Sequence, residues 1–341
     1  MLSSQLLPMK TFLTENEYKL VIDYLKSCSR GSKINPIKFS LNQGLEIGLV
    51  NRILTFLVDN DILNCLFTIR CPECGMCIKE INDITEIDKI IYCYSCEEKV
   101  EISTDDVIVL YTYKNYPFRE GQQNNMFVDD SVALGKTESL TLTQLLESHN
   151  YDLNKEFFNP SNDEYLVLEK MYNAVFEKHN TTKSKGDSLE NLVCFLFSLC
   201  KHFEVSNCVK TSSNQIDCYV RNRLFVPGIS PENCKDSIQI ECKNENKKPS
   251  ITYLNKLHSI LKTTGGNFGI IVSRCQKPST YNELANKIYL RDKILIISVD
   301  NQDLKGIILE RKNLLELLEK RIMEVKLDAT RDLAQLGLYN V

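Results

Sequence analysis

A short alternating segment carries the side chains of this chain that are best suited to metal and phosphate chemistry. Residues 237–244 read SIQIECKN, with polar Gln239, Glu241 and Lys243 between apolar positions. A period of two predicts a β-strand that buries its apolar face and turns its polar face outward. On that face the carboxylate of Glu241 can hold a hard metal ion, while the ammonium of Lys243 contacts the ion's water. Glu-x-Lys also occurs elsewhere in the chain, so the neighbouring segments decide whether this copy is functional.

A second alternating segment supplies a matching carboxylate. In residues 215–220, QIDCYV, the apolar side chains face one side while Gln215 and Asp217 face the other. If the two segments pair as a hairpin, Asp217 and Glu241 share one polar face. Two converging carboxylates make an oxygen site for Mg²⁺ or Mn²⁺, which takes few protein ligands and keeps several waters. Lys243 beside them can orient or deprotonate a metal-bound water and stabilise charge on a phosphate.

The spacing of five cysteines predicts a separate metal site. Cys71 and Cys74 form one Cys-x-x-Cys pair, and Cys93 and Cys96 form another after 18 intervening residues. With strand-like segments beside them, these pairs are typical of a zinc ribbon. Four thiolates give Zn²⁺ a closed tetrahedral shell, so we expect a structural site that supplies folding energy to a small unit. Cys77 is a fifth thiol that could replace Cys71 or Cys74; we treat it as a spare.

The composition describes an ordinary globular protein with one locally basic segment. Of the 341 residues, 43% are hydrophobic and 25% charged, and the net charge is −4. Residues 179–300 hold 17 Lys and Arg against 11 Asp and Glu, which fits a polyanionic partner there; scatter in surface charge is the alternative. No apolar run approaches the ~20 residues that a bilayer requires, and no leader follows Met1, so we expect no membrane association and a cytoplasmic location. In that reducing compartment, the 14 cysteines indicate free thiols and a metal site.

The N-terminal third predicts a small helical unit followed by strands. The expected elements are a helix capped by Thr14, helices near 41–46 and 48–59, and strands between 62 and 69. This order resembles a winged helix-turn-helix, in which the third helix enters a DNA groove. In that helix Asn51 and Arg52 are the candidates to contact DNA. A surface for a protein partner is the alternative.

The C-terminal half predicts alternating helices and strands. Ser188 or Asp187 can cap an apolar helix that runs through Cys200, which places Glu190 in its first turn. The two polar strands follow, then a helix near 251–262, a buried strand at 268–273, a helix near 281–290 and a buried strand at 294–297. This order predicts an α/β fold and resembles the α/β/α core of restriction endonucleases.

Four features of the C-terminal half together resemble the Mrr-type, type IV restriction-like branch of the PD-(D/E)xK nucleases. They are the segment 186–192, Asp217, the triplet Glu241-Cys242-Lys243 and the strand at 269–273. The resemblance covers roughly residues 184–300. It implies that Asp217 and Glu241 are the metal carboxylates, that Lys243 is the catalytic lysine, and that the backbone carbonyl of Cys242 binds the metal. The spacing of 24 residues from Asp217 to Glu241 is longer than a tight hairpin needs.

The resemblance also gives roles to two further polar residues. Glu190 would match the acidic residue often found on the first core helix. Gln215 would match the polar residue that this branch commonly carries two positions before the aspartate. We therefore include Glu190 and Gln215 among the candidate catalytic residues.

These predictions divide the chain into five parts. They are a winged-helix-like domain at 1–69, a zinc ribbon at 70–113, a linker at 114–162, a restriction-endonuclease-like nuclease domain at 163–300 and a helical extension at 301–341. Within the extension, residues 304–327 predict one long amphipathic helix that packs back on the core, with the seam of a homodimer as the alternative.

The sequence therefore favours a Mg²⁺-dependent endonuclease that hydrolyses phosphodiesters in DNA, in restriction or anti-phage defence, with N-terminal parts that select the substrate or a protein partner. Candidates for contact with backbone phosphates are Lys247, Lys248, Arg221 and Arg223. One alternative is a DNA-binding or scaffolding regulator with a catalytically silent nuclease-like domain. Another is an RNA or structure-specific nuclease that uses the same residues.

Overall fold

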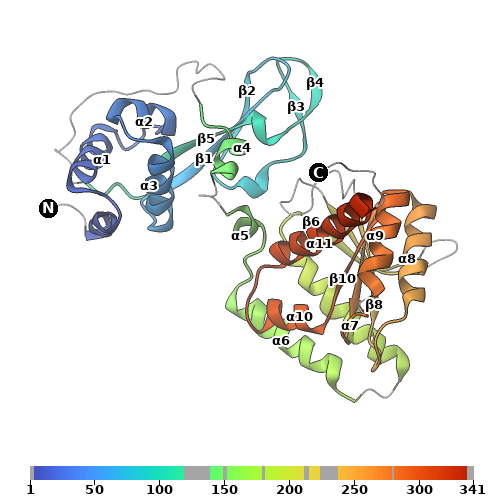
Figure 1. The fold of residues 1–341 in the computed structure, drawn as a ribbon. Helices are drawn as coiled ribbons and strands as arrows, with labels where there is room; N and C mark the ends of the chain where they lie inside the picture. The colour runs from blue at the N-terminus through green and yellow to red at the C-terminus, as the bar shows by residue number, and fades with distance from the viewer. Residues whose placement is uncertain are drawn as a thin grey trace. The chain divides into compact units, whose positions relative to one another are not determined.

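The computed structural model describes residues 4–118, 139–148, 152–178, 181–210, 215–222, 237–278 and 280–335. The chain divides into two compact units, Met1–Asp152 and Leu153–Val341, and each unit contains helices and strands (Figure 1). Residues 119–138 of the predicted linker and the connection at 223–236 lie outside the described residues.

Local capping sets the start of α1 (Glu15–Ser27) and both ends of α2 (Pro36–Gln43) in the first unit. Thr14 caps α1 through a capping box with Glu17, which confirms that prediction. The second helix starts earlier than the predicted 41–46, because the Asn35 side chain caps it and Pro36 stands at its first position. It stops at Gly44, whose φ of 62° a glycine adopts without strain. The helical elements are η1 (Ser4–Thr11), α1 (Glu15–Ser27), α2 (Pro36–Gln43), α3 (Ile47–Asp59), η2 (Ile84–Glu86), η3 (Thr104–Asp106) and α4 (Leu142–Glu147).

A three-stranded sheet in the first unit connects its helices to its cysteine-rich part. β1 is the central strand, with antiparallel partners on both sides, in the order β2-β1-β5. The predicted boundary between residues 69 and 70 therefore falls inside one sheet. β3 and β4 form a separate two-stranded ribbon. The strands are β1 (Leu63–Arg70), β2 (Cys77–Ile81), β3 (Ile90–Cys93), β4 (Glu98–Glu101) and β5 (Val107–Tyr113).

The second unit contains a five-stranded mixed sheet in the order β10-β9-β8-β7-β6. β6, β7 and β8 pair antiparallel, whereas β8, β9 and β10 pair parallel. The segments predicted as buried strands, β9 and β10, are buried along their whole length, which confirms that prediction. The strands are β6 (Phe203–Lys210), β7 (Gln215–Asn222), β8 (Ser237–Lys243), β9 (Phe268–Ser273) and β10 (Leu295–Val299).

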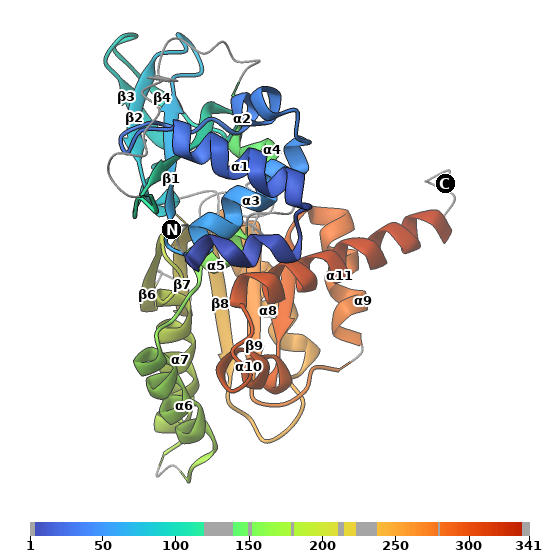
Figure 2. The same cartoon turned by 90° about the vertical axis from the view of Figure 1, so that its left-hand side faces the viewer.

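Helices cover both faces of this sheet. α7 packs on β6, β7 and β8, and α8 packs on β8 and β9 (Figure 2). Gln239 and Glu241 of β8 hydrogen-bond to Thr264 and Lys256 of α8, so the polar face of β8 lies under that helix. The prediction of an outward polar face on β8 is therefore wrong. The helices are α5 (Leu153–Phe157), α6 (Asn162–Phe176), α7 (Thr182–Ser198), α8 (Ile251–Thr264), α9 (Thr280–Asp292), α10 (Asn301–Ile308) and α11 (Leu314–Gln335).

The predicted cap of α7 is also wrong. The hydroxyl of Thr181 accepts a hydrogen bond from the backbone N–H of Ser184 at 3.0 Å, so the helix begins before Asp187 and Ser188. Glu190 consequently lies in the body of the helix, away from the N-terminal dipole that would favour an acid in the first turn.

The single helix predicted at 304–327 is two helices. α10 ends at Ile308, Arg311 takes a left-handed φ of 54°, and the side-chain oxygen of Asn313 accepts from Leu315 N at 2.8 Å to start α11. α11 packs on α9 and β10, as the prediction of packing on the core requires. The amide of Asn313 also donates to the carbonyl of Asn154 at 2.8 Å, which ties α5 to this unit.

We expect a clear stability effect where α8 crosses β9. A Cβ added at Gly269 would lie 2.8 Å from Leu261 Cδ1 and 2.9 Å from Leu257 Cδ2, both in the core. Gly269→Ala should therefore lower the free energy of unfolding by roughly 1–3 kcal/mol. The change can be measured by hydrogen exchange of the β9 amides, which reports this unit alone.

Gly186→Ala provides the matched control. Its Cβ would meet Glu190 Oε1 at an ordinary 3.6 Å within α7. Alanine should stabilise that helix by about 0.5–1 kcal/mol. Equal protection of β9 in wild type and Gly269→Ala would contradict the close packing of α8 on this strand.

Candidate functional site

The pairing of β7 with β8 brings the predicted carboxylates together. Cys218 lies opposite Ile240 and Tyr219 opposite Gln239, so the same register places Asp217 beside Glu241 on the face that α8 covers. Both acids are buried, with exposed fractions of 8% for Asp217 and 1% for Glu241. Like charges at this depth require compensation by hydrogen bonds or cations.

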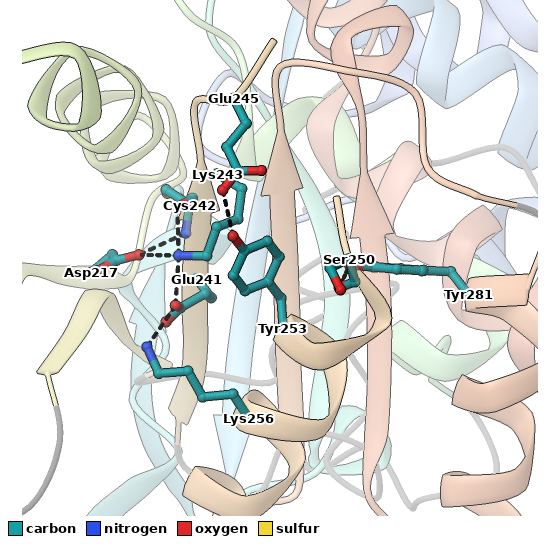
Figure 3. A network of polar contacts seen from close by, with 9 residues as sticks. All are labelled: Asp217, Glu241, Cys242, Lys243, Glu245, Ser250, Tyr253, Lys256 and Tyr281. Atoms are coloured by element: carbon teal, nitrogen blue, oxygen red, sulfur yellow. Dashed lines mark hydrogen bonds and ion pairs between the residues drawn. The ribbon is translucent and has the colours of Figure 1, made fainter. Parts of the chain in front are cut away.

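The ammonium of Lys243 supplies much of that compensation (Figure 3). Lys243 Nζ lies 2.7 Å from Glu241 Oε1 and 3.9 Å from Asp217 Oδ2, and it donates to the carbonyl of Cys242 at 3.1 Å. Burial alone would lower the pKa of Lys243, but the charge and hydrogen bond of Glu241 and the charge of Asp217 outweigh it, so the pKa is raised. Lys243 therefore stays protonated between the carboxylates.

Asp217 is held by a backbone donor. The N–H of Cys242 donates to Asp217 Oδ2 at 2.8 Å. Burial and the neighbouring Glu241 carboxylate nevertheless raise the pKa of Asp217 above its ordinary value. The charged form of Asp217 is thus available but carries a desolvation cost.

Two residues of α8 complete the arrangement, and the sequence reasoning missed both. Lys256 Nζ donates to Glu241 Oε1 at 2.8 Å. Lys243 Nζ lies 4.8 Å from the centroid of the Tyr253 ring, and the Tyr253 hydroxyl donates to the carboxylate of Glu245. That hydrogen bond and burial raise the pKa of Tyr253, so the phenol remains a donor. The available signal was their spacing of three along a predicted helix, which places Tyr253 and Lys256 on one helix face.

The hydrogen bonds of Asn244 fix the end of β8 against α7. Its side-chain amide donates to the carbonyl of Lys185 at 2.5 Å and to Ser188 Oγ at 3.1 Å. Ser188, predicted as a helix cap, thus contributes to this junction instead.

A cavity of about 590 Å³ opens where β7 and β8 meet α7. Glu190 lines it, and burial first, then the charges of Asp217 and Asp187, raise the pKa of Glu190. Gln215 is exposed at the start of β7 and is not among the lining residues that the structure describes. The lining residues are Thr182, Lys185, Gly186, Glu190, Asp217, Cys242, Lys243, Asn244, Glu245, Asn246 and Lys247.

The predicted phosphate contacts are distributed unevenly around this cavity. Lys247 lines it, together with Lys185, which was not predicted and which donates to Asn246 Oδ1 at 3.0 Å. Lys248 and Arg221 are exposed but do not line it, and Arg223 lies outside the described residues.

The oxygen donors at the centre of the site fit a hard divalent cation. The Lys243 ammonium, itself a cation, is in contact with a Glu241 carboxylate oxygen and the Cys242 carbonyl and lies close to Asp217. Carboxylate and carbonyl oxygens are the ligands that Mg²⁺ and Mn²⁺ prefer. Among the described residues, however, Asp217, Glu241 and Glu190 are not close enough to form a set of three acidic ligands. The fit therefore rests on two carboxylates and one carbonyl.

Cys71, Cys74, Cys93 and Cys96 form a separate four-cysteine cluster in the first unit. Their sulfur atoms all lie within 4.8 Å of one another, and the Cys71–Cys96 and Cys74–Cys93 sulfur distances are both 3.7 Å. Zn–S bonds of about 2.3 Å in a tetrahedron place sulfurs about 3.8 Å apart, so this four-cysteine cluster can bind zinc.

The turns before β2 and β4 shape the four-cysteine cluster. Gly75 has a φ of 73°, and its N–H donates to the carbonyl of Cys71 at 2.8 Å. A hydrogen bond from the backbone N–H of Cys96 lowers the pKa of the Cys93 thiol to about 7, which favours the thiolate that a metal needs. Cys77 is exposed in β2 and does not belong to the cluster.

Comparisons with known proteins leave the family of this chain open. No protein-family model matches it, and no curated protein matches it. One solved structure, the DNA modification-dependent restriction endonuclease AspBHI, matches with a TM-score of 0.27 and 11% sequence identity over 72% of this chain. The match spans 62% of that protein's length. A likeness of this degree does not establish a shared fold.

No helix in the described part of the chain combines the length and the apolar character that crossing a lipid bilayer requires.

We expect the protein to carry about one Zn²⁺ per chain through the four-cysteine cluster. Replacing Cys93 by Ser should remove the metal and lower the midpoint of thermal unfolding of the first unit, because metal binding contributes folding energy. Cys77→Ser is the matched control and should keep the metal. Zinc content by mass spectrometry decides: a metal-free wild type, or a metal-free Cys77→Ser, would contradict this assignment.

We expect Asp217→Asn to stabilise the second unit at neutral pH. Because the pKa of Asp217 is raised, ionisation of its carboxyl group lowers the free energy of unfolding. This loss is complete at pH values above the raised pKa and disappears as the pH falls through that pKa toward the ordinary value of 3.8. The variant should therefore unfold at a higher temperature than wild type at pH 7, and this difference should vanish in acid.

Asp292→Asn should change stability in the opposite direction and serves as the contrasting variant. A hydrogen bond from Arg291 lowers the pKa of Asp292, so Asp292→Asn should lower the midpoint of thermal unfolding at neutral pH. Thermal unfolding against pH measures both variants. A lower midpoint for Asp217→Asn at pH 7 would show that the carboxylate is stabilising.

Proposed function

We propose that this protein is a Mg²⁺-dependent nuclease that hydrolyses phosphodiester bonds in DNA, with the second unit as its catalytic domain. One observation carries the proposal: two buried carboxylates, Asp217 and Glu241, lie side by side with the Lys243 ammonium between them, and Asp217 and Lys243 line a cavity. The perturbed pKa values of Asp217 and Lys243 and their place at the wall of a cavity are typical of a catalytic site.

Each residue has a role that follows from its position. Asp217, Glu241 and the carbonyl of Cys242 would hold Mg²⁺, which when bound activates a water and withdraws charge from the phosphate. Lys243 stays protonated, so it can donate hydrogen bonds to a phosphate oxygen and stabilise the negative charge that develops there. Glu190, with its raised pKa and its place in the cavity, can exchange a proton with a leaving group or a water.

The cavity also suits a polyanionic substrate. Lys185 and Lys247 line it beside the acidic centre, where they can contact phosphates that flank the bond to be cut. We assign substrate or partner selection to the first unit, with its winged-helix-like region and four-cysteine cluster. A role in restriction or anti-phage defence follows from the resemblance to Mrr-type nucleases, and a homodimer would place two such sites on a duplex.

A DNA-binding or scaffolding protein with a silent catalytic domain is the second candidate. The observation in its favour is that Glu241 already has two lysine partners, Lys243 and Lys256, so the cluster is stable as a purely structural ion-pair network. An RNA nuclease would use the same residues on another substrate.

We expect the protein to cleave plasmid DNA in Mg²⁺ or Mn²⁺. Asp217→Ala and Lys243→Ala should each reduce the rate by at least about a hundredfold, because each removes a group that stabilises the transition state. Gel assays with a panel of methylated, unmethylated, single-stranded and branched DNA, and RNA, measure the rate and the substrate class.

Matched controls remove the same residue types elsewhere in this unit. Asp163 lies in the first turn of α6 and Lys262 near the end of α8, both exposed. Asp163→Ala and Lys262→Ala should cut at the wild-type rate. If the protein binds DNA but cleaves no substrate, the DNA-binding or scaffolding protein is favoured. If it cleaves RNA alone, the RNA nuclease is favoured.

A further inference from the structure

One carboxylate oxygen of Glu241 is shared by two ammonium groups. Oε1 lies 2.7 Å from Lys243 Nζ and 2.8 Å from Lys256 Nζ. Figure 3 shows the two lysines reaching this carboxylate from opposite sides, Lys243 from the same strand and Lys256 from α8. The roles proposed above for Asp217, Glu241 and Lys243 do not use Lys256, so its place on a proposed metal ligand needs a separate explanation.

The charges at the centre of the site already cancel. Asp217 and Glu241 contribute two negative charges, and Lys243 and Lys256 contribute two positive ones. An arriving divalent cation must compete with the ammonium groups for Glu241 Oε1, and each ammonium that stays nearby repels it. The two lysines therefore stabilise the metal-free protein and weaken its affinity for metal.

The two lysines differ in how easily they can leave. The Lys243 side chain is 17% exposed, donates to the Cys242 carbonyl and lies over the Tyr253 ring. The Lys256 side chain is 49% exposed, so its ammonium can turn into water with little desolvation or packing to lose. Lys256 is thus the partner of Glu241 that a metal ion can displace.

We propose that Lys256 is a positioning residue that holds Glu241 in the metal-free protein and competes with the divalent cation for it. This inference rests on the proposed function, because it requires that Asp217 and Glu241 bind the cation. A polyanionic substrate attracts the displaced ammonium, so substrate and metal each favour binding of the other. The site then loads metal most readily when nucleic acid is present.

The test is the affinity of the zinc-loaded, full-length protein for Mn²⁺ without nucleic acid, measured by titration calorimetry. Lys256→Gln removes the competing charge and should bind Mn²⁺ about fivefold more tightly than wild type. Lys256→Arg keeps the charge and should bind as wild type does. Lys262→Gln removes a lysine of the same helix that pairs with Asp292 at 3.7 Å, and it too should bind as wild type does.

The outcomes separate this inference from the proposed function. A variant lacking both carboxylates, Asp217→Ala with Glu241→Ala, gives the baseline. If wild type binds Mn²⁺ above that baseline and Lys256→Gln binds no more tightly, the competition is refuted while the metal site stands. If Lys262→Gln binds Mn²⁺ as tightly as Lys256→Gln does, the competition is also refuted, because the gain in affinity then comes from the loss of any positive charge. Binding at baseline by both wild type and Lys256→Gln overturns the inference together with the proposed metal site.

Discussion

The candidate site of the second unit is built around a pair of carboxylates buried side by side where β7 and β8 pair. Placing two like charges away from water costs several kcal/mol for each ion unless other groups compensate. Here compensation comes from the Lys243 ammonium, the backbone N–H of Cys242 and the Lys256 ammonium. Because these groups come from two elements of the fold, the ionic cluster forms only after β8 and α8 have both taken their places.

Helix α8 serves stability and chemistry at once. Leu257 and Leu261 lie against Gly269 of β9, while Tyr253 and Lys256 contact the lysine and carboxylate of β8. The close approach that Gly269 permits sets how near α8 lies to the sheet, and so how near its polar side chains come to the carboxylates. Packing in the core and geometry at the site are therefore coupled through one helix.

The first unit uses a different source of stability. In its cysteine-rich part, Ile81, Ile84, Ile87 and Ile102 are buried, and the four sulfurs lie at the spacing of a tetrahedral thiolate site, so bound zinc would add to this burial. The sheet β2-β1-β5 connects that part to the helices, so metal-dependent order around Cys71 would extend to the central strand β1. The second unit, by contrast, depends on strand pairing and helix packing.

Local periodicity and spacing were enough to predict most of the elements and the pairs of cysteines, because each of these follows from neighbours along the chain. The strands that carry Asp217 and Glu241 followed in the same way, but it is the pairing of β7 with β8 that brings the two carboxylates together. The covered polar face of β8 could not be predicted in this way, since the helix that covers it, α8, comes from outside the strand. Likewise, the start of α7 at Thr181, the break before α11 and the shared sheet across residues 69 and 70 appear only in the folded chain. Lys256 was hidden for the same reason: its partner lies 15 residues away, and only the folded helix brings the two charges together.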